Sequence, residues 1–174
     1  MNWRLWVPLF AFALFIGLAA YQLTQPRDDF VESRMVGQEL PYFNLPPAME
    51  GAEGVANVDF ADGTPRLLNI WASWCLPCIA EAPHLENLKR QGADIVGVAI
   101  RDRPEDVARF LAQHGNPYSR IGRDDLSEVQ LAIGSSGVPE TFVIDGQGVI
   151  RYQHIGDVRA SDVPVLLAEL EKAR

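Results

Sequence analysis

The feature that most constrains the fold is a pair of cysteines, Cys75 and Cys78, which are the only two in the 174-residue chain. Residues 66–71 before them are mostly apolar and predict a buried strand, whereas residues 79–89 after them have the pattern of a helix. A Cys-x-x-Cys pair at the point where a strand passes into a helix is typical of a thiol redox site.

The chain beyond this motif predicts an α/β domain. Residues 93–100 form a nearly continuous apolar run, as expected of a second strand that is covered on both faces. The helix between the two strands makes a crossover, which should be right-handed. We expect short extended pieces between residues 37 and 65, helices at 104–115 and 126–133, strands at 141–144 and 149–155, and a last helix capped by Ser161.

Composition excludes some classes of protein. Hydrophobic residues make up 48% of the chain and charged residues 22%, so an ordinary globular domain with one core is expected. The net charge is -8 at pH 7, and the basic residues form no run. Because phosphate binding needs concentrated Lys and Arg, we expect no nucleic-acid partner.

A metal site is not expected either. Structural zinc usually takes four Cys or His ligands, and one Cys-x-x-Cys pair supplies only two. His84, His114 and His154 lie on three different predicted elements without the spacing of metal ligands. We therefore predict no metal and no cofactor other than a redox-active disulfide between Cys75 and Cys78.

The N-terminus carries a long apolar run. From Leu5 to Leu23 the only strongly polar side chain is Gln22, and roughly 19 residues at 1.5 Å each can cross a ~30 Å hydrocarbon layer. We predict a membrane anchor at residues 1–23, a polar linker at 24–36 and a domain at 37–174. The flanking charges weakly favour a cytoplasmic N-terminus and an exported domain.

A cleaved signal peptide is the alternative to a retained anchor. Gly17 and Ala19 are small residues at the spacing that a signal peptidase prefers. The apolar run is nevertheless long for a signal peptide and continues past that site to Leu23. With either outcome the domain would face an oxidising compartment, where disulfide chemistry operates.

The helix start favours distinct roles for the two cysteines. A thiolate, rather than a thiol, attacks a disulfide, and free N–H groups with the positive end of the helix dipole would stabilise it on Cys75. Cys78, one turn along, should be more buried and resolve the mixed disulfide, while Pro77 restrains the turn. A purely structural disulfide is the alternative, but closing so short a loop would stabilise the fold little.

A second informative feature is Pro139, which follows a Gly- and Ser-rich break and enters a predicted strand. Such a proline is a candidate for a cis bond after Val138, and an ordinary trans turn proline is the alternative. The sequence alone does not distinguish the two isomers.

Several of these motifs together resemble the thioredoxin superfamily. They are Trp74 beside the cysteines, Pro83 in the following helix, and Gly137, Val138 and Pro139 before a strand, a turn, a strand and a last helix. The resemblance implies a thioredoxin-like α/β fold, in which helices flank a central mixed β-sheet. It also implies that Pro139 is cis and lies against the disulfide, and that Val138 offers its backbone to a substrate peptide.

The chain more narrowly resembles the membrane-anchored CcmG/DsbE proteins of cytochrome c maturation. Residues 137–145, 148–156 and 110–118 carry this resemblance, together with the apolar N-terminus. It implies a disulfide reductase in the bacterial inner membrane with its domain on the periplasmic side. Its partners would be apocytochrome c or other maturation thiol proteins, and a transmembrane electron donor protein would reduce its cysteines again.

Two glutamates gain roles from this resemblance. Glu81, one helical turn after Cys78, matches an acidic position of the group, and we hypothesise that it manages the proton of Cys78. A solvated helix glutamate is the alternative. Glu140, beside Pro139, would tune the site or contact partners, unless it has only a surface role. Asn69 stands where thioredoxin has a buried aspartate.

Other functions remain open at this point. A TlpA- or ResA-like reductase for cytochrome oxidase assembly or general thiol repair fits the cysteines, Glu81 and Pro83 equally well. A peroxiredoxin fits poorly, because Ala72 stands three residues before Cys75, where that class has Thr or Ser. From a different class, a non-catalytic metal- or peptide-binding module is the alternative. Residues 133–136 also depart from the group, whose members commonly carry an aromatic-containing segment there.

Overall fold

The structure, a computed structural model, describes residues 3–24 and 35–174. The chain divides into two compact units, residues 1–32 and 33–174. The first contains helix α1, Trp3–Thr24. In the part of the chain that is described, no helix meets both the length and the apolar character of a membrane span. Most of the predicted linker at 24–36 lies outside the described residues.

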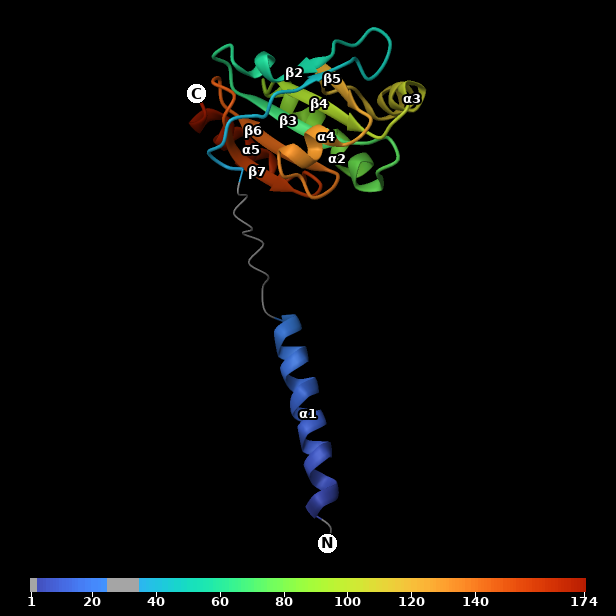
Figure 1. Cartoon of the computed structure of the whole chain (residues 1–174), viewed down its shortest axis with the longest axis vertical. Coiled ribbons are helices and arrows are strands. Elements are labelled where there is room, and N and C mark those ends of the chain that lie inside the picture. Colours follow the sequence, from blue (N-terminus) through green and yellow to red (C-terminus); the bar gives the residue numbers. More distant parts are fainter. Residues whose placement is uncertain (1–2, 25–34) are drawn as a thin grey trace. The chain divides into compact units, whose positions relative to one another are not determined.

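The second unit is built on a five-stranded mixed sheet in the order β5-β4-β3-β6-β7 (Figure 1). Strand β3 pairs in parallel with β4, and β4 with β5, whereas β6 runs antiparallel to both β3 and β7. The predicted central mixed sheet is therefore confirmed. The strands are β3 (Arg66–Trp71), β4 (Ile95–Ile100), β5 (Arg120–Asp124), β6 (Glu140–Ile144) and β7 (Ile150–Ile155).

The two strands that flank the first crossover are buried almost throughout. Every residue of β4 is buried, and β3 is buried except for Arg66 at its start. This explains why both appear in the sequence as apolar runs without alternation. Trp71, at the end of β3, is fully buried and packs between the rings of Phe110 and Tyr118, at centroid distances of 4.9 and 5.3 Å.

Four helices complete the domain. The first, α2, connects β3 to β4 and contacts both α3 and α5, and α5 also packs on β6. The amphipathic α3 buries Val107, Phe110 and Leu111, as its spacing of apolar residues predicts. The helices are α2 (Leu76–Arg90), α3 (Pro104–His114), α4 (Glu128–Ala132) and α5 (Val163–Lys172).

Strand β5 was not among the predicted strands, because Ile121 is the only large apolar residue in it. Two short strands, β1 (Asn44–Leu45) and β2 (Val55–Ala56), pair antiparallel and are followed by the 3-10 turn η1 (Asn57–Phe60). The segment that connects β1 to β2, residues 46–54, covers the outer edge of β5. Both backbone polar groups of Ile121 bond to this connection: the carbonyl accepts from the N–H of Ala48 at 2.9 Å, and the N–H donates to the carbonyl of Glu53 at 3.0 Å.

The prediction that Ser161 caps the last helix is wrong. The chain turns once more through Asp162, whose N–H donates to the carbonyl of Arg159 at 3.0 Å, before α5 begins at Val163. Ser161 therefore lies too far back to reach a free helix N–H. Its hydroxyl donates to Asp162 Oδ1 at 3.3 Å instead.

The sheet also brings the cysteine motif and the segment around Pro139 to one of its ends. Strand β3 ends where the cysteine loop, residues 72–75, begins, and antiparallel β6 begins directly after Pro139. In the register of these strands Ile70 lies opposite Glu140. The segments around Cys75 and Pro139, far apart in sequence, therefore emerge from the same end of the sheet.

Candidate active site

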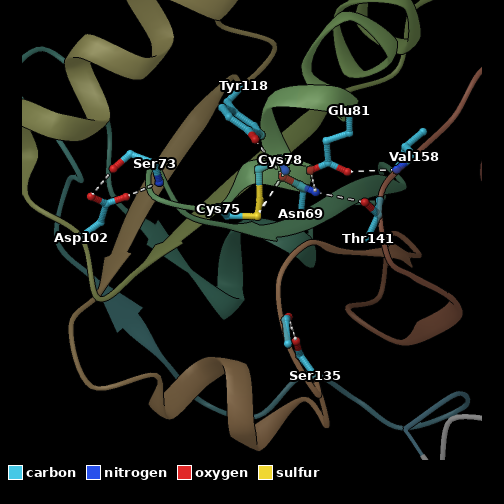
Figure 2. Close-up of a disulfide and its surroundings, with 11 residues drawn as sticks. Asn69, Ser73, Cys75, Cys78, Glu81, Asp102, Tyr118, Ser135, Thr141 and Val158 are labelled. Atoms are coloured by element: carbon cyan, nitrogen blue, oxygen red, sulfur yellow. Dashed lines mark hydrogen bonds between the residues drawn. A yellow bond between two sulfur atoms is a disulfide. The ribbon is translucent and has the colours of Figure 1, made fainter.

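A disulfide joins Cys75 and Cys78 at the start of α2, with 5.3 Å between their Cα atoms (Figure 2). Cys75 is the N-cap residue, and its Sγ accepts a hydrogen bond from the N–H of Cys78 at 3.2 Å. Free N–H groups at a helix start favour negative charge, so this position suits a thiolate on Cys75 once the disulfide opens. Pro77 occupies the first turn of α2, where its missing N–H costs the helix no hydrogen bond.

The expected difference in burial between the cysteines is small in this oxidised state. Cys75 is 4% exposed and Cys78 2% exposed. Their neighbours Trp74 and Leu76, in contrast, are 58% and 76% exposed. The pair therefore lies just below a surface that is apolar on both sides of Cys75.

The peptide bond between Val138 and Pro139 is cis, as the resemblance implied. Within residues 35–174, neither backbone polar group of Val138 has a hydrogen-bond partner. The carbonyl of Pro139, in contrast, accepts from the N–H of Gly156 at 3.1 Å. The structure thus leaves the backbone of Val138 available at the end of the sheet from which the cysteine loop also emerges.

Glu81 lies in a network of buried polar groups beside the disulfide (Figure 2). Its Oε1 accepts from Asn69 Nδ2 at 3.2 Å, and its Oε2 accepts from the N–H of Val158 at 3.1 Å. Asn69 also donates to Thr141 Oγ1 at 3.1 Å and accepts from the hydroxyl of Tyr118 at 2.7 Å. The alternative of a solvated Glu81 is therefore wrong.

This environment changes the acidity of Glu81. Burial raises the pKa of Glu81 to about 7, although the hydrogen bonds from Val158 and Asn69 lower it. Burial also raises the pKa of Tyr118 well above its usual range, and the nearby charge of Glu81 adds to that effect. A carboxyl with a pKa near neutrality can take up or release a proton at physiological pH. Glu81 lies one helical turn from Cys78.

Glu140 is also buried, which excludes the surface role considered for it. Its Oε1 accepts from both the N–H and the hydroxyl of Ser136, at 2.9 and 2.6 Å. Its Oε2 accepts from Gln153 Nε2 on β7 at 2.8 Å. Glu140 thus fixes the segment that precedes Pro139, within the stretch where the sequence departs from the CcmG/DsbE pattern.

Sequence reasoning missed a second set of contacts, between the cysteine loop and the end of β4. Asp102 accepts from the N–H of Ser73 at 2.6 Å and from the Ser73 hydroxyl at 2.7 Å (Figure 2). Trp74 Nε1 donates to the carbonyl of Arg101 at 3.3 Å. The available signal was positional, because residues that follow neighbouring parallel strands meet at one edge of the sheet.

No metal centre is visible in the described ranges, 3–24 and 35–174, where no three His, Cys, Asp or Glu side chains are grouped to hold an ion.

Comparison with known proteins gives consistent matches. The Redoxin family model matches residues 35–170. The thiol:disulfide interchange protein HelX of Rhodobacter capsulatus is 38% identical over 169 residues, which cover 94% of this chain and 95% of that protein. The thiol:disulfide interchange protein DsbE of Vibrio cholerae is 39% identical over 170 residues, with 95% and 92% covered.

A solved structure supports the same assignment. A crystal structure from Chlorobium tepidum, assigned as a thiol:disulfide interchange protein DsbE, has a TM-score of 0.67 and 29% identity, covering 79% of this chain and 96% of that one. The thioredoxin-like fold implied by the sequence is thereby confirmed. The chain belongs to the Redoxin family, within which it is a thiol:disulfide oxidoreductase related to DsbE and HelX.

Proposed function

We propose that this oxidoreductase is an exported reductase that acts on disulfides of apocytochrome c or of a thiol protein of cytochrome c maturation, and that Cys75 and Cys78 are its reacting pair. The observation that carries the proposal is the position of Cys75 as N-cap of α2, with the N–H of Cys78 directed at its sulfur. The choice of pathway rests on the resemblance of residues 137–145 and 148–156 to the CcmG/DsbE group.

The reaction begins from the dithiol form. The thiolate of Cys75 attacks one sulfur of the substrate disulfide, whose S–S bond breaks, leaving one substrate thiol and a mixed disulfide. Cys78 then attacks the sulfur of Cys75, releases the second substrate thiol and closes the Cys75–Cys78 disulfide. Two electrons pass to the substrate, and the two protons of the dithiol end on the two substrate thiols.

Glu81 serves the second half of this reaction. Cys78 must lose its proton before it attacks, and a base whose pKa is near the working pH transfers protons efficiently. The pKa of Glu81, raised to about 7 by burial, meets that condition one turn from Cys78. The contacts with Asn69 and Val158 hold both carboxyl oxygens in place.

The segment around Pro139 binds the substrate in this proposal. The unpaired backbone of Val138 forms main-chain hydrogen bonds with an extended peptide, next to the reacting cysteine of that peptide. Glu140 supports this segment through Ser136, and Trp74 offers an exposed ring on the other side of Cys75. No cofactor enters the cycle, since a transmembrane donor protein returns the two electrons.

We further propose that residues 1–23 anchor the protein in the bacterial inner membrane, and that residues 37–174 lie on the periplasmic side. The support is the apolar run from Leu5 to Leu23 in the sequence. The match to HelX covers 94% of the chain and therefore extends into this segment.

A mixed-disulfide trap in the native membrane tests the function. In the Cys78→Ser variant Cys75 still attacks, but the adduct cannot be resolved, so apocytochrome c or a maturation thiol protein should accumulate on it. The double variant, in which Cys75→Ser is added, should trap nothing. Copper-site proteins on Cys75 would instead favour a TlpA- or ResA-like reductase, and a wild-type protein that fails to reduce insulin would favour a non-catalytic binding module.

A further inference from the structure

A groove of about 440 Å³ opens beside the cysteine loop, and of its lining residues only Trp74 takes part in the steps above. One wall consists of Ser73, Trp74 and Ile79, which flank the two cysteines in sequence, and the other is formed by residues 101–103 and α3. In Figure 2, Ser73 and Asp102 lie on one side of the cysteines and Glu81 on the other. A substrate segment bound to Cys75 can therefore occupy the groove without touching the buried hydrogen-bond network around Glu81.

The charge of the groove is opposite to that of the chain. The whole sequence carries -8, yet three arginines line the groove, together with two aspartates. Asp106 is paired with Arg109 at 2.8 Å. Within residues 35–174, the exposed guanidinium groups of Arg101 and Arg103 have no ion pair or hydrogen bond.

Among the residues that the structure describes, the other aspartate of the groove, Asp102, forms no ion pair with Arg101 or Arg103. The carboxylate of Asp102 is 8% exposed and accepts three hydrogen bonds, two from Ser73 and one from the N–H of Arg103 at 2.9 Å. Asp102 therefore ties the cysteine loop to the end of β4, and its buried carboxylate is less accessible to a ligand than the exposed guanidinium groups of Arg101 and Arg103. What the groove offers a ligand is the positive charge of Arg101 and Arg103.

The backbone of Arg101 is held next to the exposed indole of Trp74. Arg101 donates its N–H to the carbonyl of Asp124 at 3.1 Å, and its own carbonyl accepts from Trp74 Nε1 at 3.3 Å. These contacts hold Arg101 at a φ of 47°, in the left-handed region that residues other than glycine rarely adopt. The indole of Trp74, 58% exposed, and the side chain of Ile79 form an apolar surface beside the cations.

We propose that this groove binds the part of the substrate protein next to its reacting cysteine, and that it selects segments with a carboxylate side chain close to that cysteine. An apolar residue of the segment lies on Trp74 and Ile79, while an Asp or Glu pairs with Arg101 and Arg103. The inference rests on the proposed exchange at Cys75 and adds to it a preference for acidic partner sequences.

Peptide disulfides test this preference on the full-length reduced protein. All peptides share one neutral sequence with one internal disulfide. In each peptide a single position, one of the three on either side of one cysteine, carries Glu, Gln or Lys. Exchange would be followed by quenching with an alkylating reagent and mass spectrometry. At the best position and low salt, Glu should react roughly ten times faster than Lys, with Gln between them, and high salt should reduce the difference.

Two variants locate the effect. The double variant Arg101→Gln, Arg103→Gln should lower the rate for the Glu peptide to that of the Gln peptide. Arg90→Gln removes the same charge from an exposed position at the far end of α2 and should change nothing. Hydroxyethyl disulfide, small and neutral, gives the basal rate of each protein, to which the rates of that protein with the peptides are normalised.

The outcomes separate this inference from the proposed function. If wild-type protein reduces hydroxyethyl disulfide but reacts equally with the Glu, Gln and Lys peptides at every position, the groove inference is overturned and the exchange at Cys75 stands. If hydroxyethyl disulfide does not react at all, both are overturned. The comparison among peptides needs only the wild-type chain, so it decides the matter even if a variant fails to fold.

Discussion

Glu81 carries an unusual cost, because its carboxylate is buried in the folded chain and solvated in the unfolded one. Its pKa is about 7 in the fold and 4.5 as the ordinary value. Below 4.5 the group is protonated in both states, so the fold pays no penalty. Between pH 4.5 and 7 the unfolded chain releases this proton while the fold retains it, so the free energy of unfolding should fall with rising pH, by about 3 kcal/mol in total, and level off above pH 7.

The variant Glu81→Gln should remove this loss. Urea unfolding of the oxidised protein at pH 4 and pH 8 should show that the decrease in stability over this interval is about 3 kcal/mol smaller in the variant than in the wild type. Glu50→Gln, at an exposed loop position, is the control and should leave the pH dependence unchanged. An identical pH dependence in the Glu81→Gln variant and the wild type would contradict the raised pKa.

The same variant tests the kinetic role. If Glu81 accepts the proton of Cys78, closure of the Cys75–Cys78 disulfide from the mixed disulfide should be at least about tenfold slower in Glu81→Gln. The wild-type rate should show an inflection near pH 7 that the variant lacks, as measured by rapid-quench experiments between pH 5.5 and 8.5. A variant with the wild-type rate and profile would assign Glu81 a purely structural role.

The position of Glu81 could be predicted from the sequence, whereas its surroundings could not. Its spacing from Cys78 along the helix is local information. The other members of its hydrogen-bond network, Asn69, Thr141 and Val158, come from three separate segments that only the folded chain brings together. For the same reason the sequence suggested an acid near Cys78 but gave no basis for deciding between a buried and a solvated one.

At the scale of elements, α4 is short and depends on a side chain outside it. Both carboxyl oxygens of Asp124, the last residue of β5, accept from the first turn of the helix: Oδ1 from the N–H of Glu128 at 2.9 Å, and Oδ2 from Val129 at 3.0 Å and Gln130 at 3.1 Å. Asp124 thus caps α4, although the N-cap position itself is occupied by Ser127, three residues later in the chain.

Replacing this cap should therefore destabilise the domain. Asp124→Ala is expected to lower the free energy of unfolding by about 2 kcal/mol, because it leaves three helix N–H groups without partners. The neighbouring Asp125→Ala, which removes only an exposed pair with Arg123, should change it by less than about 0.5 kcal/mol. Equal effects of the two substitutions in urea unfolding would argue against the capping role.

Elements with strong local patterns were predictable, and elements defined by their neighbours were not. The apolar β4 and the amphipathic α3 follow from residue periodicity alone. Strand β5 has a single large apolar residue and exists because β4 pairs with one edge and the chain after β1 covers the other. At Gly122 in this strand, an added Cβ would approach Leu45 Cβ of β1 at 2.9 Å, so only glycine fits between β5 and β1.

At the scale of the whole molecule, the core lies entirely in the second unit. Among the described residues, the buried cluster runs from Leu40 to Leu170. Removal of residues 1–32 should thus leave a folded domain whose melting temperature is within ~2 °C of that of the full-length protein in detergent. The truncated form should reduce hydroxyethyl disulfide at an unchanged rate, whereas its association with membranes should be lost.

Membrane fractionation and mass spectrometry of the native protein complete that test. A retained anchor predicts the full-length mass in a membrane fraction that resists alkaline carbonate. A mass that corresponds to cleavage after Ala19 would contradict the anchor and favour the signal peptide. Unfolding of the truncated domain would contradict the assignment of residues 1–36 to anchor and linker.

The separation of Glu81 from the arginine-lined groove, on opposite sides of the disulfide, has an evolutionary consequence. Selection can alter Arg101 and Arg103, which are exposed, without disturbing the buried groups to which we assign the proton of Cys78. Descendants of one ancestral reductase can therefore acquire different clients while their chemistry remains the same. Engineering can follow the same route, since recoding two surface positions would redirect the enzyme without rebuilding its centre.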